Sequence, residues 1–256
     1  MKAMVLAAGL GTRLRPLTND RPKALVEVAG RTLLEITLAR LRAFGVGQVI
    51  VNVHHFADQV VAYLKAHDNF GMKVEISRED DALLDTGGGL KKAAWFFLPG
   101  PRGSADTNDE PFFLHNVDVI SNIDLDRMMK SHREENALAT LAVQDRETSR
   151  YLLFDEAMQL VGRRSSRDER GATQWARPSE NAQPLAFSGI HVISPRLLGM
   201  ISEPGAFSII STYLRLAAQG EKILAFRADG AYWRDLGRPE NVIQAAEDLK
   251  HGSLNL

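Results

Sequence analysis

The first 25 residues, MKAMVLAAGLGTRLRPLTNDRPKAL (1–25), determine how the rest of the chain is interpreted. The apolar run from Ala3 to Ala8 is typical of a buried strand, and it leads into a loop that contains Gly9, Gly11 and Thr12. Glycines allow backbone N–H groups to approach an anion closely, and basic side chains add charge-assisted hydrogen bonds to phosphate oxygens. The basic residues of this segment are Arg13, Arg15, Arg21 and Lys23. The segment therefore predicts a phosphate-binding site.

Two common phosphate-binding loops are excluded by their spacing. A P-loop needs Gly, four residues and then Gly-Lys-Ser/Thr, which the segment from Gly9 to Lys23 does not contain. A dinucleotide-binding fingerprint needs a small residue three positions after its second glycine, and Leu14 stands there. A basic surface loop without a ligand is the alternative that stays open.

The order of these residues resembles the opening of the sugar-1-phosphate nucleotidyltransferases, which is a strand, a Gly-x-Gly-x-Arg loop, Pro-Leu-Thr and Pro-Lys. The matching segments are Gly9-Leu10-Gly11-Thr12-Arg13, Pro16-Leu17-Thr18 and Pro22-Lys23. The resemblance implies that Arg13 contacts the leaving pyrophosphate and Lys23 the α-phosphate of a nucleoside triphosphate. It further implies that the nucleotide is bound by Leu6, Ala8, Gly9, Gly11 and Thr12.

Composition limits the class of protein. A chain of 256 residues can bury a substantial core, and we expect one α/β domain. The 31 Lys and Arg nearly balance the 32 Asp and Glu, which argues against nucleic acid or a membrane as partner. The chain contains no cysteine, so disulfides and thiolate metal sites are excluded. The short apolar run near Lys2 is unlike a signal peptide, and we expect a cytoplasmic protein.

Alternating strand and helix patterns predict the fold class. Thr32 and Glu35 have the spacing of a capping box before an apolar helix that stops at Gly45. The β-branched run 48–53 predicts a strand, and 57–66 predicts the next helix. We therefore expect a Rossmann-like, mostly parallel mixed sheet flanked by helices, which the resemblance identifies as the GT-A-like nucleotidyltransferase fold. No hexapeptide repeats follow, so a C-terminal β-helix is not expected.

A second glycine-rich segment, Asp85-Thr86-Gly87-Gly88-Gly89, precedes a helix predicted from Lys91 to about Phe97. Three glycines lower the stability of a segment unless the backbone needs unusual dihedral angles or something approaches closely. The resemblance implies that Gly87 and Gly88 contact the base. A purely structural loop is the alternative.

The strand predicted at 112–114 ends before Asn116 and Asp118, at the sheet edge where open α/β proteins bind ligands. The resemblance implies that Asp118 holds Mg²⁺ and that Asn116 contacts the sugar. Val117 replaces a family glycine, which puts in doubt how closely a nucleotide can approach. Turn capping by Asp118 is the alternative.

The segment Trp233-Arg234-Asp235-Leu236-Gly237-Arg238-Pro239 matches the family pattern Trp-x-Asp-x-Gly-Thr/Arg-Pro. The resemblance implies that Asp235 is the second Mg²⁺ ligand. We predict that Asp118 and Asp235 meet in the fold, because both follow strand-like stretches. An ion pair of Asp235 with Arg234 or Arg238 is the alternative.

The segment Phe187-Ser188-Gly189-Ile190 resembles the family strand that lines the sugar pocket, which implies sugar contacts for Ser188 and Gly189. The family's Glu-Lys-Pro element, whose lysine meets the sugar phosphate, is missing, so that ligand stays unassigned. The polar stretch 163–184 is interpreted as a solvated loop, with a lid over bound phosphates as the alternative. Within one domain, we expect a nucleotide-binding part at 1–135 and a sugar-binding part at 136–235.

The resemblance implies transfer of a nucleotidyl group from a nucleoside triphosphate to a sugar 1-phosphate, with Mg²⁺ as cofactor. The short chain and the Thr-Gly-Gly-Gly step are most similar to N-acetylmuramate-1-phosphate uridylyltransferases of cell-wall recycling. GTP-dependent mannose-1-phosphate guanylyltransferases are the first alternative. A catalytically weak regulatory protein that binds sugar nucleotides is the second. The sequence does not predict the oligomeric state.

Overall fold

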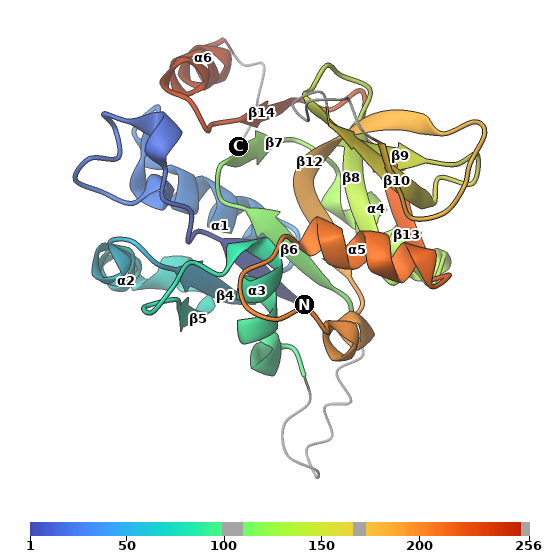
Figure 1. Cartoon of the computed structure of the whole chain (residues 1–256). Helices are drawn as coiled ribbons and strands as arrows, with labels where there is room; N and C mark the ends of the chain where they lie inside the picture. Colours follow the sequence, from blue (N-terminus) through green and yellow to red (C-terminus); the bar gives the residue numbers. More distant parts are fainter. Residues whose placement is uncertain (99–109, 166–172, 252–256) are drawn as a thin grey trace.

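The structure is a computed structural model that describes residues 1–98, 110–165 and 173–251. A central sheet is covered by helices on both faces (Figure 1). The α-helices are α1 (Leu33–Ala43), α2 (Ala57–Ala66), α3 (Asp85–Lys92), α4 (Leu125–Glu134), α5 (Ile209–Ala218) and α6 (Pro239–Lys250). The short 3-10 helices are η1 (Thr12–Leu14), η2 (Lys23–Leu25), η3 (Asp68–Gly71), η4 (Ala94–Phe96) and η5 (Pro195–Met200).

The strands form one large sheet and two small ones. They are β1 (Lys2–Leu6), β2 (Glu27–Val28), β3 (Arg31–Thr32), β4 (Gln48–Val53), β5 (Lys73–Arg78), β6 (Phe112–Asn116), β7 (Val119–Ser121), β8 (Ala139–Gln144), β9 (Arg150–Phe154), β10 (Leu160–Ser165), β11 (Thr173–Trp175), β12 (Gln183–Ile193), β13 (Ile223–Arg227) and β14 (Trp233–Asp235). The large sheet has the order β11-β10-β9-β12-β6-β1-β4-β5, and β8 pairs with both β12 and β13. The small sheets are β14-β7 and β2-β3.

The predicted α/β class with a mixed sheet is confirmed. Strands β5, β4, β1 and β6 are parallel to one another, and β8 and β13 form another parallel pair. Strand β12 runs antiparallel to β6, β8 and β9 and so connects the parallel half to the rest of the sheet. The carboxyl ends of β1 and β6 therefore lie side by side, and the loops that follow them meet there.

The core consists of two layers, one on each face of the sheet. Side chains alternate along a strand, and in β1 Ala3 and Val5 belong to one hydrophobic cluster while Met4 belongs to the other. Helices α1, α2, α4 and α6 cover the first face, and α3 and α5 cover the second. Full burial of a side chain such as Leu38 contributes roughly 1.5–3 kcal/mol.

Local signals located the first helices well. The Thr32 hydroxyl accepts a hydrogen bond from the backbone N–H of Glu35 at 3.1 Å, so the predicted N-cap of α1 is present. Helix α2 has the predicted bounds. The start predicted for the helix after the glycines is wrong, because α3 begins at Asp85 rather than Lys91 and contains all three glycines.

The interpretation of 163–184 as a solvated loop is wrong for 163–165, 173–175 and 183–184, which belong to strands, and right for 176–182, which form no helix or strand. Residues 163–165 end β10, and β11 pairs with it antiparallel, with Arg163 opposite Gln174. Residues 166–172 lie outside the described part of the chain. Polar and charged residues are common on edge strands, because they discourage pairing with other chains, and the mixed-charge composition therefore concealed a β-hairpin.

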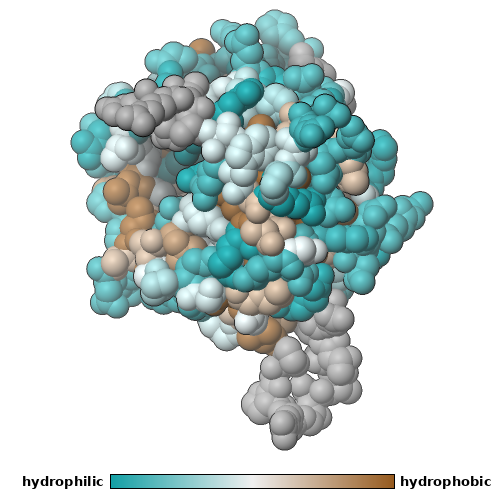
Figure 2. Space-filling view, turned by 45° about the vertical axis from the view of Figure 1, so that its right-hand side comes forward, coloured by the Kyte–Doolittle hydropathy of each residue, from teal (hydrophilic) through white to brown (hydrophobic). Residues whose placement is uncertain are grey.

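The visible surface is mostly polar. On the face shown in Figure 2, hydrophilic side chains predominate and apolar ones form small patches. Within residues 1–98, 110–165 and 173–251, none of the helices combines the length and the apolar composition that crossing a membrane requires.

Candidate active site

The loop after β1 is shaped by Gly11 and folds back onto Lys23. Gly11 has a φ of 66°, and its carbonyl accepts a hydrogen bond from the Thr18 hydroxyl at 2.8 Å. A Cβ atom at position 11 would lie 2.9 Å from Thr18 Cγ2 and 3.3 Å from Lys23 Cβ. Glycine is therefore required both by the dihedral angle and by the close approach.

Lys23 and Asp118 form an ion pair across 95 positions of sequence. Lys23 Nζ contacts Asp118 Oδ2, and Lys23 is only 9% exposed. The place of Lys23 in the loop beside Pro22 predicts an exposed side chain, and this is wrong, because η2 turns the side chain inward against the end of β6. Removal of the lysine would leave Asp118 without its charged partner, so the stability of the fold depends on it.

The two predicted metal-ligating aspartates come from neighbouring segments. Strand β14 pairs antiparallel with β7, which places Asp235 opposite Val119, the residue next to Asp118. The Asp118 carbonyl accepts a hydrogen bond from the backbone N–H of Leu236 at 2.8 Å. Asp118 and Asp235 line the same cavity.

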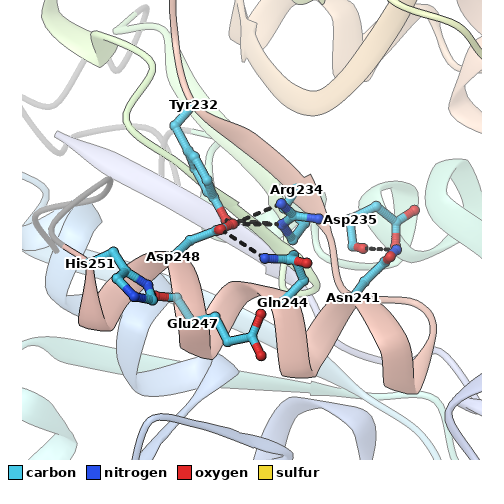
Figure 3. Close-up of polar contacts among 8 residues, drawn as sticks. All are labelled: Tyr232, Arg234, Asp235, Asn241, Gln244, Glu247, Asp248 and His251. Carbon is cyan, nitrogen blue, oxygen red and sulfur yellow. Dashed lines mark hydrogen bonds and ion pairs between the residues drawn. The ribbon is translucent and has the colours of Figure 1, made fainter.

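Arg234 does not neutralise Asp235. Its guanidinium instead pairs with Asp248 of α6 at 2.7 Å, and the Tyr232 hydroxyl donates to the same carboxylate at 2.6 Å (Figure 3). Asn241 Nδ2 donates to the Asp235 carbonyl at 2.7 Å, so α6 holds β14 in place. Asp235 Oδ1 accepts a hydrogen bond from the backbone N–H of Gly237 at 2.6 Å. Throughout the described ranges, Asp235 has no ion-pair partner within 4.0 Å, Arg238 included.

Arg13 of η1 reaches the same region. A Cβ atom at Gly237 would lie 2.7 Å from Asp235 Oδ1 and 2.9 Å from Arg13 Nη2. The two charged groups therefore lie on either side of Gly237, and any larger residue there would displace one of them. The first and last motifs of the chain meet at this glycine.

Two cavities adjoin at Asn116 and Asp118. The first, named here the apolar cavity, has a volume of about 310 Å³ and is lined by Leu6, Ala7, Ala8, Gly9, Lys23, Asn52, Leu83, Asp85, Thr86, Asn116, Val117 and Asp118. The second, named the arginine cavity, has a volume of about 440 Å³. It is lined by Asn116, Asp118, Val119, Arg146, Thr148, Arg150, Tyr151, Leu152, Arg163, Arg164, Ser165, Phe187, Gly189, Ser208, Ile210, Trp233 and Asp235.

Only some of the predicted nucleotide-binding residues line one of the two cavities. Leu6, Ala8 and Gly9 line the apolar cavity, whereas Gly11 and Thr12 lie outside both cavities. Val117 fills part of the cavity wall, and its backbone does not adopt a left-handed conformation. The valine therefore changes the shape of the wall without straining the turn.

Gly87 and Gly88 face protein atoms rather than the apolar cavity. A Cβ atom at position 87 would lie 2.2 Å from the Phe207 ring, and one at position 88 would lie 2.7 Å from the Gly205 carbonyl oxygen. These glycines allow α3 to pack against the segment before α5, and their predicted contact with the base stays a prediction. The neighbouring residues Asp85 and Thr86 line the cavity instead.

A buried polar network that the sequence analysis missed supports the apolar cavity. Asn52 Oδ1 accepts from the backbone N–H of Ala7 at 2.7 Å, and Asn52 Nδ2 donates to Glu79 Oε1 at 2.7 Å. Glu79 Oε2 accepts from the backbone N–H of Leu84 at 2.8 Å. The network joins the two walls of the cavity. The sequence feature that could have indicated this network is Asn52, a polar residue inside the β-branched run 48–53.

Of the two predicted sugar-binding residues on β12, Gly189 lines the arginine cavity and Ser188 does not. Gly189 lines it with a φ of 74°, at a register shift of β12, and a Cβ atom there would lie 2.9 Å from Asn116 Nδ2. Ser188 is fully buried and outside the lining, and its carbonyl accepts from Trp233 Nε1 at 2.7 Å. Ser188 therefore positions Trp233.

Four arginines give the second cavity its name, and the sequence analysis missed two of them, Arg146 and Arg150, while the other two lie in the stretch 163–184. The four are Arg146, Arg150, Arg163 and Arg164. Burial lowers the pKa of Arg146, and the charge of Asp235 opposes this effect. The cavity therefore combines several cations with the carboxylates of Asp118 and Asp235.

Comparison with known proteins agrees with this geometry. A family model described as "Nucleotidyl transferase" matches residues 2–252. The chain belongs to this family of nucleotidyltransferases. An N-acetylmuramate alpha-1-phosphate uridylyltransferase of Caulobacter vibrioides is 36% identical over 254 residues, which cover 96% of each chain. A mannose-1-phosphate guanyltransferase of Yarrowia lipolytica is 29% identical, and the match spans 95% of this chain and 62% of the yeast protein.

The fold is shared with solved nucleotidyltransferases. The structure of a UDP-glucose pyrophosphorylase complexed with UDP-glucose matches with a TM-score of 0.74 at 16% identity, over 98% of each chain. The family match and the relatives in sequence identify the chain as an enzyme, a sugar-1-phosphate nucleotidyltransferase.

Proposed function

We propose that this nucleotidyltransferase joins UTP and N-acetylmuramate 1-phosphate to form UDP-N-acetylmuramate and pyrophosphate. The observation that carries the proposal is the similarity to the Caulobacter uridylyltransferase along nearly the whole of both chains. The arginine cavity supports an acidic sugar, because N-acetylmuramate carries a carboxylate in addition to its phosphate. Guanidinium groups such as those of Arg163 and Arg164 suit a carboxylate geometrically.

The two cavities divide the substrates between them in this proposal. The nucleoside of UTP occupies the apolar cavity against Leu6, Ala8 and Gly9, and the sugar occupies the arginine cavity against Asn116 and Gly189. A phosphate oxygen of the sugar 1-phosphate bonds to the α-phosphorus of UTP, and the bond from that phosphorus to the bridging oxygen breaks. Pyrophosphate then leaves with the electron pair. The reacting atoms meet near Asp118, where the cavities adjoin.

Lys23 and Arg13 supply positive charge to this reaction. Lys23 lines the apolar cavity beside Asp118 and would contact the α-phosphate, while Arg13 would contact the leaving pyrophosphate. Fixed charges of this kind stabilise a transition state, because they need no reorganisation when charge develops on the phosphoryl oxygens. Positioning of two polyanions is the main catalytic task of the protein.

Asp118 and Asp235 would hold Mg²⁺. Their carboxylates line one cavity from paired segments. Asp118 Oδ2 contacts Lys23 and Asp235 Oδ1 accepts from Gly237, so the other oxygen of each carboxylate would be the hard donor. No group of three His, Cys, Asp or Glu side chains suitable for a metal occurs among residues 1–98, 110–165 and 173–251. Mg²⁺ supplies neutralisation of phosphoryl charge when bound, and two carboxylates with phosphate oxygens and water suffice for it.

The broader assignments belong to the same proposal. We assign nucleotide binding mainly to residues 1–135 and sugar binding mainly to 136–235, within one domain. A cytoplasmic location and a role in cell-wall recycling rest on the resemblance to N-acetylmuramate 1-phosphate uridylyltransferases and on the absence of cysteine. GTP-dependent transfer to mannose 1-phosphate is the second candidate, and similarity to the Yarrowia enzyme supports it.

Pyrophosphate release tests the proposal. The purified chain is incubated with Mg²⁺, each of UTP, GTP, CTP and ATP, and a panel of sugar 1-phosphates. We expect the highest kcat/KM for UTP with N-acetylmuramate 1-phosphate. Preference for GTP with mannose 1-phosphate would support the second candidate. Release from no pair, together with measurable binding of UDP-sugars, would instead support a regulatory protein.

A further inference from the structure

Arg146 is held rigidly in the wall of the arginine cavity. Its guanidinium carbon lies 3.6 Å from the centroid of the Trp233 ring, and its Nη2 donates to the Phe187 carbonyl at 2.8 Å. Trp233 in turn donates from Nε1 to the Ser188 carbonyl at 2.7 Å. Both side chains are therefore attached to the same irregular part of β12. A guanidinium held in this way loses little further conformational entropy when it binds a ligand.

The positive charge of Arg146 has no matched counter-charge. Within the described ranges, no carboxylate lies within 4.0 Å of its guanidinium, and its Nε is buried without a hydrogen-bond partner. A buried donor without a partner costs about 1–3 kcal/mol, and more when it is charged. An anionic ligand that entered the cavity would supply the missing counter-charge.

The position of Arg146 indicates which anion this is. Trp233 and Asp235 are two residues apart on β14, so their side chains lie on the same face of the strand. Stacking on Trp233 places Arg146 on the same side of the cavity as Asp235, one of the two carboxylates near which the phosphates meet in the proposed reaction. Arg163 and Arg164 belong instead to the exposed hairpin of β10 and β11.

We propose that Arg146 binds the phosphate group of the sugar 1-phosphate and determines the affinity for that substrate. The inference rests on the proposed reaction. It assigns the contact that the missing Glu-Lys-Pro lysine leaves open. The planar guanidinium can donate two hydrogen bonds to a phosphate while it stays stacked on Trp233, which a lysine cannot do.

The test compares Arg146→Gln and Arg146→Lys with the wild type in steady-state kinetics. The sugar 1-phosphate used is whichever one the wild type converts fastest. For Arg146→Gln we expect the KM for the sugar 1-phosphate to rise at least tenfold, with the KM for the nucleoside triphosphate within twofold of wild type. Arg146→Lys should recover only part of this loss. The exposed Arg127 supplies the control variant, Arg127→Gln, which should behave as wild type.

A second measurement separates the phosphate from the rest of the sugar. The corresponding sugar without its phosphate is used as a competitive inhibitor, and its inhibition constant should be the same for wild type and Arg146→Gln. An equal loss with the unphosphorylated sugar would show that Arg146 binds another part of the sugar and would overturn the proposal. An unchanged KM for the sugar 1-phosphate in a variant with wild-type circular dichroism would also overturn it.

The outcome is independent of which sugar proves to be the substrate. If the wild type prefers mannose 1-phosphate, the proposed function is wrong, but the role of Arg146 is still tested with that substrate. If no sugar 1-phosphate is converted, binding of N-acetylmuramate 1-phosphate by calorimetry provides the comparison. Equal affinities of wild type and Arg146→Gln in that assay would overturn the role of Arg146.

Discussion

Acid should destabilise this fold through its buried histidines, and His132 offers a clean test. His132 of α4 is buried, and its Nδ1 is hydrogen-bonded to the Thr140 hydroxyl at 2.9 Å. Burial lowers the pKa of His132 from 6.5 to about 4, with smaller effects from Arg133 and Arg196. The folded state therefore resists protonation of this ring.

The sign and size of the effect follow from proton linkage. Below pH 6.5 the unfolded chain binds a proton at His132, whereas the folded chain does so only below about pH 4. The free energy of unfolding therefore falls as the pH drops from 6.5 towards 4 and stops changing below that. At pH 5 the loss is about 2 kcal/mol for this residue. Burial also lowers the pKa of His115 to about 4 and of His191 to about 3, so the three together cost about 6 kcal/mol at pH 5.

Urea unfolding at pH 7.5 and pH 5.0 measures this difference. We expect the wild type to lose about 6 kcal/mol between the two conditions, and His132→Asn to lose about 4 kcal/mol, because one titrating group is gone. Thr140→Val is the control, since it removes the hydrogen-bond partner but keeps the ring, and it should retain the wild-type loss. If His132→Asn and the wild type lose the same free energy, the assignment to His132 is wrong.

Three further predictions concern the active site and its supports. Lys23→Ala should lower kcat by at least a hundredfold in pyrophosphate assays and also lower the melting temperature; a rise in KM alone would refute its role in the transition state. Asp118→Asn and Asp235→Asn should each remove most activity and weaken the dependence on Mg²⁺, and an unchanged Mg²⁺ titration would remove that residue from the site. Gly87→Ala should destabilise the protein by about 1–3 kcal/mol in urea unfolding, because its Cβ would meet the Phe207 ring; Gly199→Ala, with no atom within 4 Å, is the control.

Much of the fold could be predicted from local patterns. Three predicted elements are present: β1 at the apolar run after Lys2, α1 at the Thr32 cap and β4 at the β-branched run 48–53. They could be predicted because the hydrophobic periodicity of strands and helices is a local property of the sequence. The secondary-structure predictions were wrong where the amino-acid composition of a segment was unusual for the element that it forms. The charged hairpin of β10 and β11 looked like a loop, and the glycines at 87–89 looked unlike a helix although α3 contains them.

The candidate site was predicted in part. The motifs identified Lys23, Asp118 and Asp235 as functional candidates, because their spacing within each motif is a local property of the chain. The same spacing does not reveal that Lys23 is buried against Asp118, or that Gly88 packs against the Gly205 carbonyl. Those facts depend on how distant segments are brought together.

The sequence by itself determined the family, the glycine-rich basic loop after the first strand and the types of side chain available for the chemistry. Only the tertiary structure decided which of them meet. The parallel pairing of β1 with β6 brings the loop after β1 to the apolar cavity, and the antiparallel pairing of β7 with β14 brings Asp235 to the adjoining arginine cavity. Arg146 lies in the arginine cavity, stacked on Trp233 and hydrogen-bonded to the irregular part of β12. The spacing of apolar residues along the chain predicts local secondary structure. A binding site depends instead on the order and register of strands that are far apart in the chain.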